Sequence, residues 1–193
     1  NFGDTPTVEI GGQSCTDPVV SEEDTRIVCS VPSGSGLQTL VLDVAGLEVT
    51  YPFAYADPSI DENGISADDY GTDGAGSLTI AGANFGDANS DISVTVGGAD
   101  CPVNSWSHTD VICDLPEGVG TGNLVVVTVS ELDSNSDTFS YDAPTVDTFS
   151  PDPVPAAATS VTIYGDNLGT SSFTASVVLL GGTCTLTSQS HTE

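Results

Sequence analysis

The stretch Gly82-Ala83-Asn84-Phe85-Gly86 opens a pattern that the chain repeats. Its Asn-Phe-Gly core has counterparts at Asn1-Phe2-Gly3 and at Asn167-Leu168-Gly169, at intervals of 83 residues. Later landmarks move in step, because Val94-Thr95-Val96-Gly97-Gly98 corresponds to Val8-Glu9-Ile10-Gly11-Gly12. A period longer than the roughly 20–50 residues of solenoid repeats indicates small domains, each with its own core. The pattern therefore predicts a tandem array of domains.

Two proline-containing junctions, Asp57/Pro58 and Ala143/Pro144, divide the array into units. We predict a partial domain at residues 1–57, which lacks its N-terminal strand, and a complete domain at 58–143. A second partial domain at residues 144–193 lacks its C-terminal part. We therefore expect the sequence to be a segment of a longer repeat protein. Junctions this short, stiffened by proline, predict a restricted angle between neighbouring units.

Alternation of apolar and polar residues predicts β-strands along the whole chain. Residues 77–81, 92–96 and 160–164 alternate, whereas 124–129 is an apolar run suited to a sandwich strand. Clusters of Gly, Pro, Asn and Asp separate these runs, and no segment has the apolar stripe of a helix. About seven short strands in the complete unit predict an all-β fold of tandem immunoglobulin-like β-sandwiches.

The cysteines recur at matching places in the repeat. Cys15 and Cys29 correspond to Cys101 and Cys113, and Cys184 corresponds to the first member of each pair. We predict one disulfide within each unit, with the partner of Cys184 lying outside this sequence. No unit offers the four closely spaced Cys or His ligands that a zinc site needs. Disulfides indicate an oxidising compartment, and therefore an extracellular or cell-surface location.

The charge of the chain excludes several functions. Arg26 is the one basic residue beside 28 acidic residues, and the formal net charge is −27. Nucleic-acid binding needs clusters of Lys and Arg, as does attachment to anionic membranes, so neither is expected. The sequence also has no run of 18 apolar residues, so we expect no direct membrane insertion in this segment. Self-repulsion favours screening by salt, neutralisation by divalent cations, or an elongated shape.

Several motifs in the complete unit resemble the IPT/TIG domain, the immunoglobulin-like module of plexins, hepatocyte-growth-factor-type receptors and Rel-type transcription factors. They are the segment 82–86, Val94-Thr-Val-Gly-Gly98-x-x-Cys101, Cys113-x-x-Pro116 and Phe139-x-Tyr141. The third unit repeats the pattern at residues 161–169. The resemblance implies adhesion or receptor stalks, accessory domains of carbohydrate-active enzymes, or DNA-binding dimers. The chain departs from the transcription-factor branch because it has no basic recognition loop.

Two acidic clusters suggest structural Ca²⁺ as the one candidate cofactor. In the first, Asp87, Asn89 and Asp91 place oxygen ligands at alternate positions, as at the start of a calcium loop, although the glycine and late Glu of an EF-hand are missing. The second cluster is predicted at the junction before the complete unit, and its members are Asp57, Asp61, Glu62, Asp68, Asp69 and Asp73. The alternative interpretation is that these residues are solvated caps of turns.

The remaining candidate residues are two histidines and a tryptophan. His108 and His191 occupy equivalent positions beside serines, but neighbours in sequence cannot supply the convergent geometry of a catalytic triad, so no enzyme is predicted. Trp106 has Glu23 and Gln189 at the equivalent positions of the other units. Because a core role would recur, we predict that Trp106 is exposed and contacts a partner or a glycan.

Together these features predict a non-enzymatic segment of a long extracellular repeat protein, acting as a structural or adhesive rod or as the subunit of an extracellular fibre. The expected partners are other copies or repeats of the same protein, or a cell-surface protein or glycan. One alternative is the ectodomain stalk of an adhesion or signalling receptor. Another is a glycan-binding accessory module of a secreted enzyme. Flanking transmembrane sequence would favour the first alternative, and an adjacent catalytic domain would favour the second.

Overall fold

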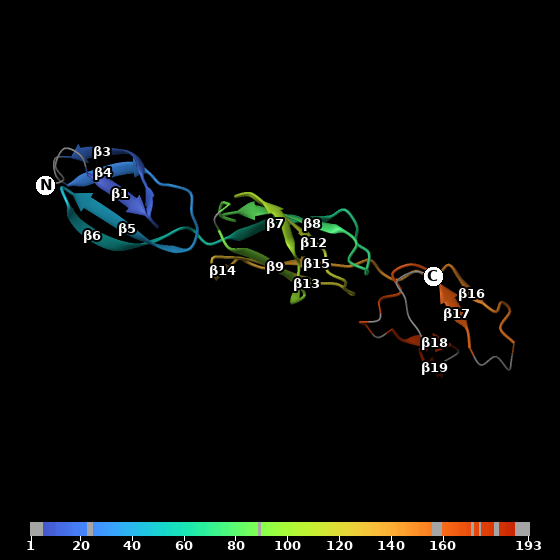
Figure 1. The fold of residues 1–193 in the computed structure, drawn as a ribbon. Helices are drawn as coiled ribbons and strands as arrows, with labels where there is room; N and C mark the ends of the chain where they lie inside the picture. Colours follow the sequence, from blue (N-terminus) through green and yellow to red (C-terminus); the bar gives the residue numbers. More distant parts are fainter. Residues whose placement is uncertain are drawn as a thin grey trace.

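The computed structural model describes residues 6–22, 25–88, 90–155, 160–170, 172–173, 175–179 and 182–187. These residues form strands, turns and loops without a helix, which confirms the predicted all-β fold. Accordingly, the described part of the chain contains no helix long and apolar enough to cross a membrane. The strands of the three units follow one another along an elongated molecule (Figure 1).

The middle unit is a sandwich of two antiparallel sheets. One sheet has the order β11-β12-β8-β7, and the other has the order β10-β9-β13-β14, with β15 also paired to β13. This order matches the ABED and GFC sheets of an immunoglobulin sandwich, with β7, β8, β12 and β11 as strands A, B, E and D. The bounds are β7 (Ser59–Ala67), β8 (Ser77–Ala83), β9 (Ile92–Val96), β10 (Ala99–Asp100), β11 (Val103–Trp106), β12 (Asp110–Asp114), β13 (Asn123–Val129), β14 (Leu132–Asp133) and β15 (Asp137–Phe139).

The core of this sandwich follows from the two-residue period of its strands. Every second residue of β8 is buried, including Leu78 and Ile80, and so is every second residue of β13 from Val125 to Val129. The disulfide between Cys101 and Cys113 crosses this core, since the first cysteine follows β10 and the second lies in β12 of the opposite sheet. The predicted disulfide within this unit is therefore present, and it ties the two sheets together at a position other than the B–F position of antibody domains.

The first unit has the same connectivity from its first described strand onward. Its sheet β2-β1-β5-β6 faces the hairpin β3-β4, and a disulfide joins Cys15 to Cys29. Its described residues include no counterpart of β7 and β8, so β6 has a largely uncovered face on which Leu47, Val49 and Tyr51 are 78%, 60% and 71% exposed. The bounds are β1 (Thr7–Ile10), β2 (Gln13–Ser14), β3 (Thr16–Glu22), β4 (Arg26–Ser30), β5 (Leu37–Val44) and β6 (Leu47–Ala54).

The third unit is described as two hairpins. Strand β16 (Thr148–Ser150) pairs with β17 (Thr162–Tyr164), and β18 (Val177–Leu179) pairs with β19 (Gly182–Cys184). These are the counterparts of β7 to β10 in the middle unit. Cys184 has no disulfide partner among the described residues.

A close backbone crossing explains one glycine of the repeated motif. A Cβ atom on Gly82 would lie 2.0 Å from the carbonyl oxygen of Ser59, and one on Gly165 would lie 2.0 Å from that of Thr145. Each glycine stands two residues before the asparagine of the Asn-x-Gly motif. Only a residue without a side chain fits this crossing, so the same contact recurs in both units.

Removing the Cys101–Cys113 disulfide by the double substitution C101A/C113A should destabilise the middle unit by about 3 kcal/mol, because a loop of this length loses its closure constraint in the unfolded chain. Trp106 is the only tryptophan, so its fluorescence in urea reports the unfolding of this unit alone. Cys184→Ala is the matched control and should leave the Trp106 transition in place. Equal shifts for the two variants would contradict the structural role of the bond.

Candidate functional site

The two joints between units are built from the same pair of loops. We call residues 32–36 and their counterparts 116–120 the tail loops, which follow the strand that carries the second cysteine. We call residues 84–90 and their counterparts 167–172 the head loops, which follow the second strand of the next unit. Asn89 and Ser171 lie outside the described residues. In each joint, the tail loop of one unit contacts the head loop of the following unit.

A tyrosine holds each tail loop in place. The Tyr55 hydroxyl donates to the carbonyl oxygen of Pro32 at 2.8 Å, and the Tyr141 hydroxyl donates to that of Pro116 at 2.7 Å. In the middle unit, a Cβ atom on Gly118 would lie 2.3 Å from the Tyr141 ring, so the ring packs directly on the loop backbone. Burial raises the pKa of Tyr141, which keeps its hydroxyl protonated as a donor. The closing Phe-x-Tyr motif and the Pro-x-Gly motif therefore form one local structure.

An asparagine begins each head loop and reaches back toward the preceding unit. Asn84 and Asn167 have φ values of +62° and +55°, a left-handed conformation that asparagine tolerates better than most residues. The Asn84 amide nitrogen donates to the carbonyl oxygen of Asp57 at 3.0 Å. The Asn167 amide oxygen accepts from the backbone N–H of Thr72 at 3.2 Å. The same motif residue thus anchors both head loops.

In the first joint, hydroxyl groups of the tail loop form hydrogen bonds with the head loop and with Ser130 of the middle unit. The Ser33 hydroxyl donates to Oδ2 of Asp87 at 2.7 Å. The hydroxyl of Ser35, which is 8% exposed, lies 3.0 Å from that of Ser90 and 2.8 Å from that of Ser130. Burial, and then the negative charge of Asp87 across the joint, raises the pKa of Tyr55. The carboxylate in this joint belongs to the following unit.

The second joint reverses these roles. The carboxylate belongs to the tail loop, where Glu117 accepts a hydrogen bond from the Ser172 hydroxyl. This bond, and then the nearby Thr170 side chain, favour the ionised carboxylate and hold the pKa of Glu117 below its ordinary value. Glu117 is the counterpart of Ser33, and Thr170 is the counterpart of Asp87.

The sequence predicts constrained junctions, but the pattern does not identify the residues that contact one another across them. A signal was present: the residue after the tail proline and the residue after the head glycine are Ser33 with Asp87 in one joint, and Glu117 with Thr170 in the other. Each pair contains one carboxylate and one hydroxyl. Sequence alone does not reveal that loops separated by more than fifty residues meet across a joint.

The six acidic residues of the second calcium cluster do not form one group, although Asp69 and Asp73 both approach Gly71, where a Cβ atom would lie 3.1 Å from a carboxylate oxygen of each. Asp68, Asp69 and Asp73 cap backbone N–H groups of Ser77, Gly71 and Ala75 at 2.5, 2.8 and 3.2 Å. Strand β7 separates this loop from Asp57, and it carries the exposed Asp61 and Glu62 along its length. The six residues therefore do not crowd the first junction as predicted.

The other candidate calcium loop, which contains Asp87 and Asp91, also makes hydrogen bonds to other parts of the protein. The Asp87 carboxylate accepts from Ser33, and the backbone carbonyl of Asp91 accepts from the N–H of Ser130 at 2.9 Å. Asn89 lies outside the described residues. In the described part of the chain, no group of three or more His, Cys, Asp or Glu is placed to hold a metal ion. The turn-cap interpretation accounts for the contacts that the structure gives Asp68, Asp69 and Asp73.

Trp106 is half-buried rather than exposed, which corrects the prediction. It packs against the core of the middle unit, and its indole N–H donates to the carbonyl oxygen of Asp87 at 3.1 Å. The tryptophan thus braces the head loop of the first joint. It is unique to this unit because Glu23 and Gln189 replace it elsewhere, and both lie outside the described residues. His108 is exposed, and His191 also lies outside the described residues.

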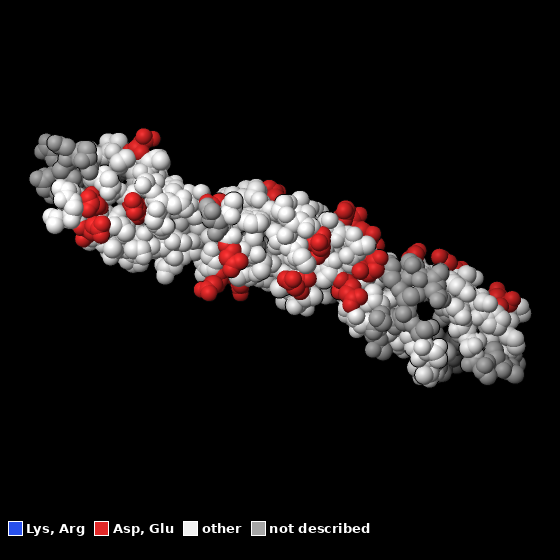
Figure 2. All heavy atoms as spheres, viewed as in Figure 1, with Lys and Arg blue, Asp and Glu red and all other residues white. Residues whose placement is uncertain are grey.

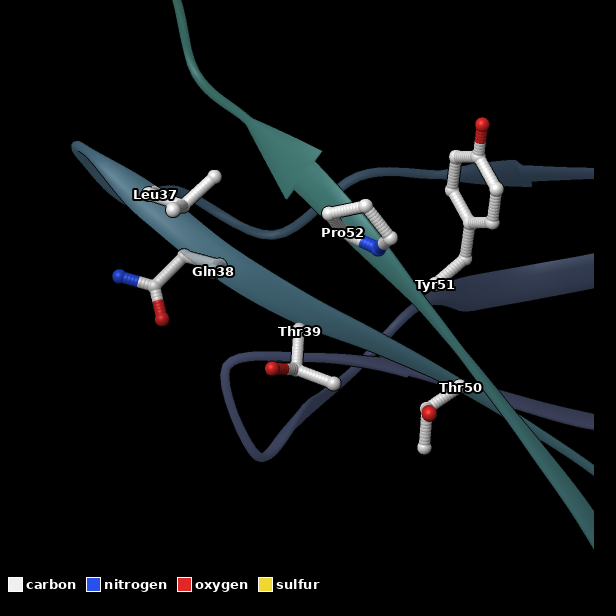
Figure 3. Close-up of a pocket in the computed structure, with 6 residues that line it drawn as sticks. All are labelled: Leu37, Gln38, Thr39, Thr50, Tyr51 and Pro52. Atoms are coloured by element: carbon white, nitrogen blue, oxygen red, sulfur yellow. The ribbon is translucent and has the colours of Figure 1, made fainter.

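A second surface feature is an open groove of about 420 Å³ at one end of the β5-β6 ladder. Figure 3 shows its six lining side chains, three from each strand: Leu37, Gln38, Thr39, Thr50, Tyr51 and Pro52. Leu37 is 75% exposed and Tyr51 is 71% exposed, so the groove is shallow. Ligand pockets bury most of the ligand surface, and this groove does not have that shape.

Comparison with known proteins identifies the middle unit. The family described as the IPT/TIG domain matches residues 70–141, which confirms the resemblance. No curated protein matches the chain. Among solved structures, the surface glycan-binding protein PbSGBP-B from Prevotella bryantii is 20% identical, with a TM-score of 0.49 over 70% of this chain and 33% of that one. The full extracellular region of plexin A4 is 20% identical, with a TM-score of 0.44 over 84% of this chain and 15% of that one. This chain thus spans a third or less of the length of either protein.

Tyr141→Phe should lower the free energy of unfolding of the middle unit by about 1–2 kcal/mol, because the Pro116 carbonyl loses its donor while the ring remains. The measurement is urea unfolding followed by Trp106 fluorescence. The control is Tyr51→Phe, which removes a hydroxyl from an exposed ring of the first unit. An equal, negligible effect of both substitutions would show that the tail loop does not depend on the tyrosine.

The second joint should weaken in acid. The pKa of Glu117 lies below its ordinary 4.5, so its contact is fully present above that value and is lost as the pH falls through the lowered pKa. A carbon-13 NMR titration of the Glu117 carboxyl measures this pKa. Ser172→Ala should move it up toward 4.5, whereas Ser105→Ala, on an exposed position of β11, should not. An unchanged pKa in the Ser172 variant would rule out the hydrogen bond.

Proposed function

We propose that this chain, whose middle unit is an IPT/TIG domain, is a segment of a longer extracellular protein and acts as a non-enzymatic structural or adhesive rod. The observation that carries the proposal is the recurrence of one joint. Two successive pairs of units are connected through equivalent loops, and equivalent tyrosines hold the tail loops. The asparagine that begins each head loop contacts the preceding unit in both joints, through Asp57 in the first and through Thr72 in the second. A joint that recurs in this way gives each unit a similar orientation to the next.

The contacts at each joint are numerous enough to restrict its motion. The first joint has three side-chain hydrogen bonds between tail-loop and middle-unit residues, beside the Asn84 contact to Asp57. Each contributes about 1 kcal/mol. These bonds form between segments that a short, proline-containing junction already holds close together. Little additional loop-closure entropy is therefore lost when they form.

Two properties support an extracellular location. The disulfides Cys15–Cys29 and Cys101–Cys113 are stable in oxidising compartments. The acidic side chains are spread along all three units on the face shown in Figure 2, where no Lys or Arg is visible. Because repulsion between charges farther apart than about 10 Å is largely screened at 0.1 M salt, spreading them along a rod lowers its cost. We propose other copies or repeats of the same protein as the main partners.

Electron microscopy of the native, unproteolysed protein tests the proposal. We expect straight or gently curved rods with a regular axial repeat, assembled laterally or end to end into fibres. Flexible beads with variable angles between units would contradict the rod. Straight rods that never assemble would contradict the fibre and favour the alternative of a receptor or adhesion stalk.

A further inference from the structure

The carboxylate lies on the head loop in the first joint and on the tail loop in the second joint, and this difference restricts the order in which the units can follow one another. In the first joint, the tail loop supplies a hydroxyl, Ser33, and the head loop supplies a carboxylate, Asp87. In the second, the tail loop supplies the carboxylate, Glu117, and the head loop supplies the hydroxyls of Thr170 and Ser172. Each joint is therefore complementary, with a carboxylate acceptor facing a hydroxyl donor.

The middle unit carries a carboxylate at both of its ends. Its head loop presents Asp87, and its tail loop presents Glu117. If this unit followed a copy of itself, two carboxylates would meet at the position where the structure has one carboxylate and one hydroxyl. Ionised carboxylates only accept hydrogen bonds, so this pair would have no donor and would carry two like charges. The chain has a single Arg and no Lys, so few cations are available to neutralise such a pair.

We propose that the residue after the tail proline and the head-loop residues that face it form a pairing rule that determines which units can be neighbours. A tail loop with Glu accepts a head loop that bears hydroxyls, and a head loop with Asp accepts a tail loop that bears a hydroxyl. The rule rests on the units being joined as in the proposed rod. It defines which repeat can precede and which can follow the middle unit along the chain.

Asp87 is well suited to pairing with a tail loop because hydrogen bonds to its backbone fix the position of its own loop. Its backbone N–H is donated to the Ser90 hydroxyl at 3.0 Å, and its carbonyl accepts from the Trp106 indole at 3.1 Å. The carboxylate is consequently held toward the preceding unit by contacts that do not involve its own oxygens. Replacing the Asp87 side chain leaves both backbone contacts available, so the pairing can be altered without removing the loop.

A charge-exchange experiment on the 193-residue chain tests the rule. Ser33→Glu places a carboxylate opposite Asp87 and recreates the excluded pair. The double substitution S33E/D87T recreates the pair of the second joint at the position of the first. Ser105→Glu adds the same charge at an exposed position of β11. The readout is the rotational correlation time of each unit from nitrogen-15 NMR relaxation, which falls for a unit whose joint loosens.

We expect S33E to shorten the correlation time of the first unit relative to the middle unit, and S33E/D87T to restore the wild-type ratio. The control S105E should leave the ratio unchanged. Repulsion of one charge pair near 4 Å in water is worth about 1 kcal/mol, so the open joint should become about fivefold more populated. Salt at 1 M, where screening acts within about 3 Å, should reverse part of this loosening.

The pairing rule is wrong if S33E leaves the ratio unchanged, or if adding D87T to it fails to restore the ratio. If S33E unfolds the first unit, the double variant S33E/D87T still tests the rule. A folding defect caused by the glutamate alone would persist in the double variant, whereas a defect caused by repulsion from Asp87 would disappear. The wild-type chain gives a separate readout for the proposed rod. Unequal correlation times in the wild type would contradict the rod, whereas equal times with no response to S33E would contradict only the rule.

Discussion

The hydrogen bond from a closing tyrosine to the carbonyl of the tail-loop proline is the interaction on which the arrangement depends. It recurs as Tyr55 to Pro32 and as Tyr141 to Pro116. The bond joins the last strand of a sandwich to the loop after its second cysteine, and the ring leaves room only for glycine in that loop. Because the residue that contacts the next unit immediately follows the bonded proline, the tyrosine fixes where each joint begins.

The negative charge of the chain opposes close contact between units. A chain with a net charge of −27 repels itself, and every contact between units must avoid bringing carboxylates together. The joints meet this requirement by pairing each carboxylate with hydroxyls, which donate without adding charge. Elsewhere, carboxylates such as Asp68 and Asp69 are used within turns, where backbone N–H groups satisfy them. Hydroxyl and backbone donors thus perform the role that Lys and Arg have in most proteins.

Much of the fold was predictable because it depends on local patterns. Strand alternation, the glycines at Gly82 and Gly118 and the spacing of Cys101 and Cys113 have local causes, and the glycines and the cysteine pair each recur in one other unit. The contacts of the joint are harder to predict from the sequence, because Ser33 and Asp87 meet only through the relative placement of two domains. Trp106 was predicted incorrectly for a related reason: we inferred exposure from its absence in the other units, whereas it braces a loop specific to its own unit. The acidic residues of the second calcium cluster are close in sequence but not in space, because β7 separates Asp57 from the loop that carries Asp68, Asp69 and Asp73.

Residual dipolar couplings measured on the wild-type chain in one dilute alignment medium test the central claim most directly. If the recurring joints hold the units as a rod, couplings from the first and middle units will fit a single alignment tensor, of equal magnitude in both and oriented as the structure places them. Tensors of clearly different magnitude would mean that the units reorient independently. That result would contradict a joint fixed by the tail and head loops.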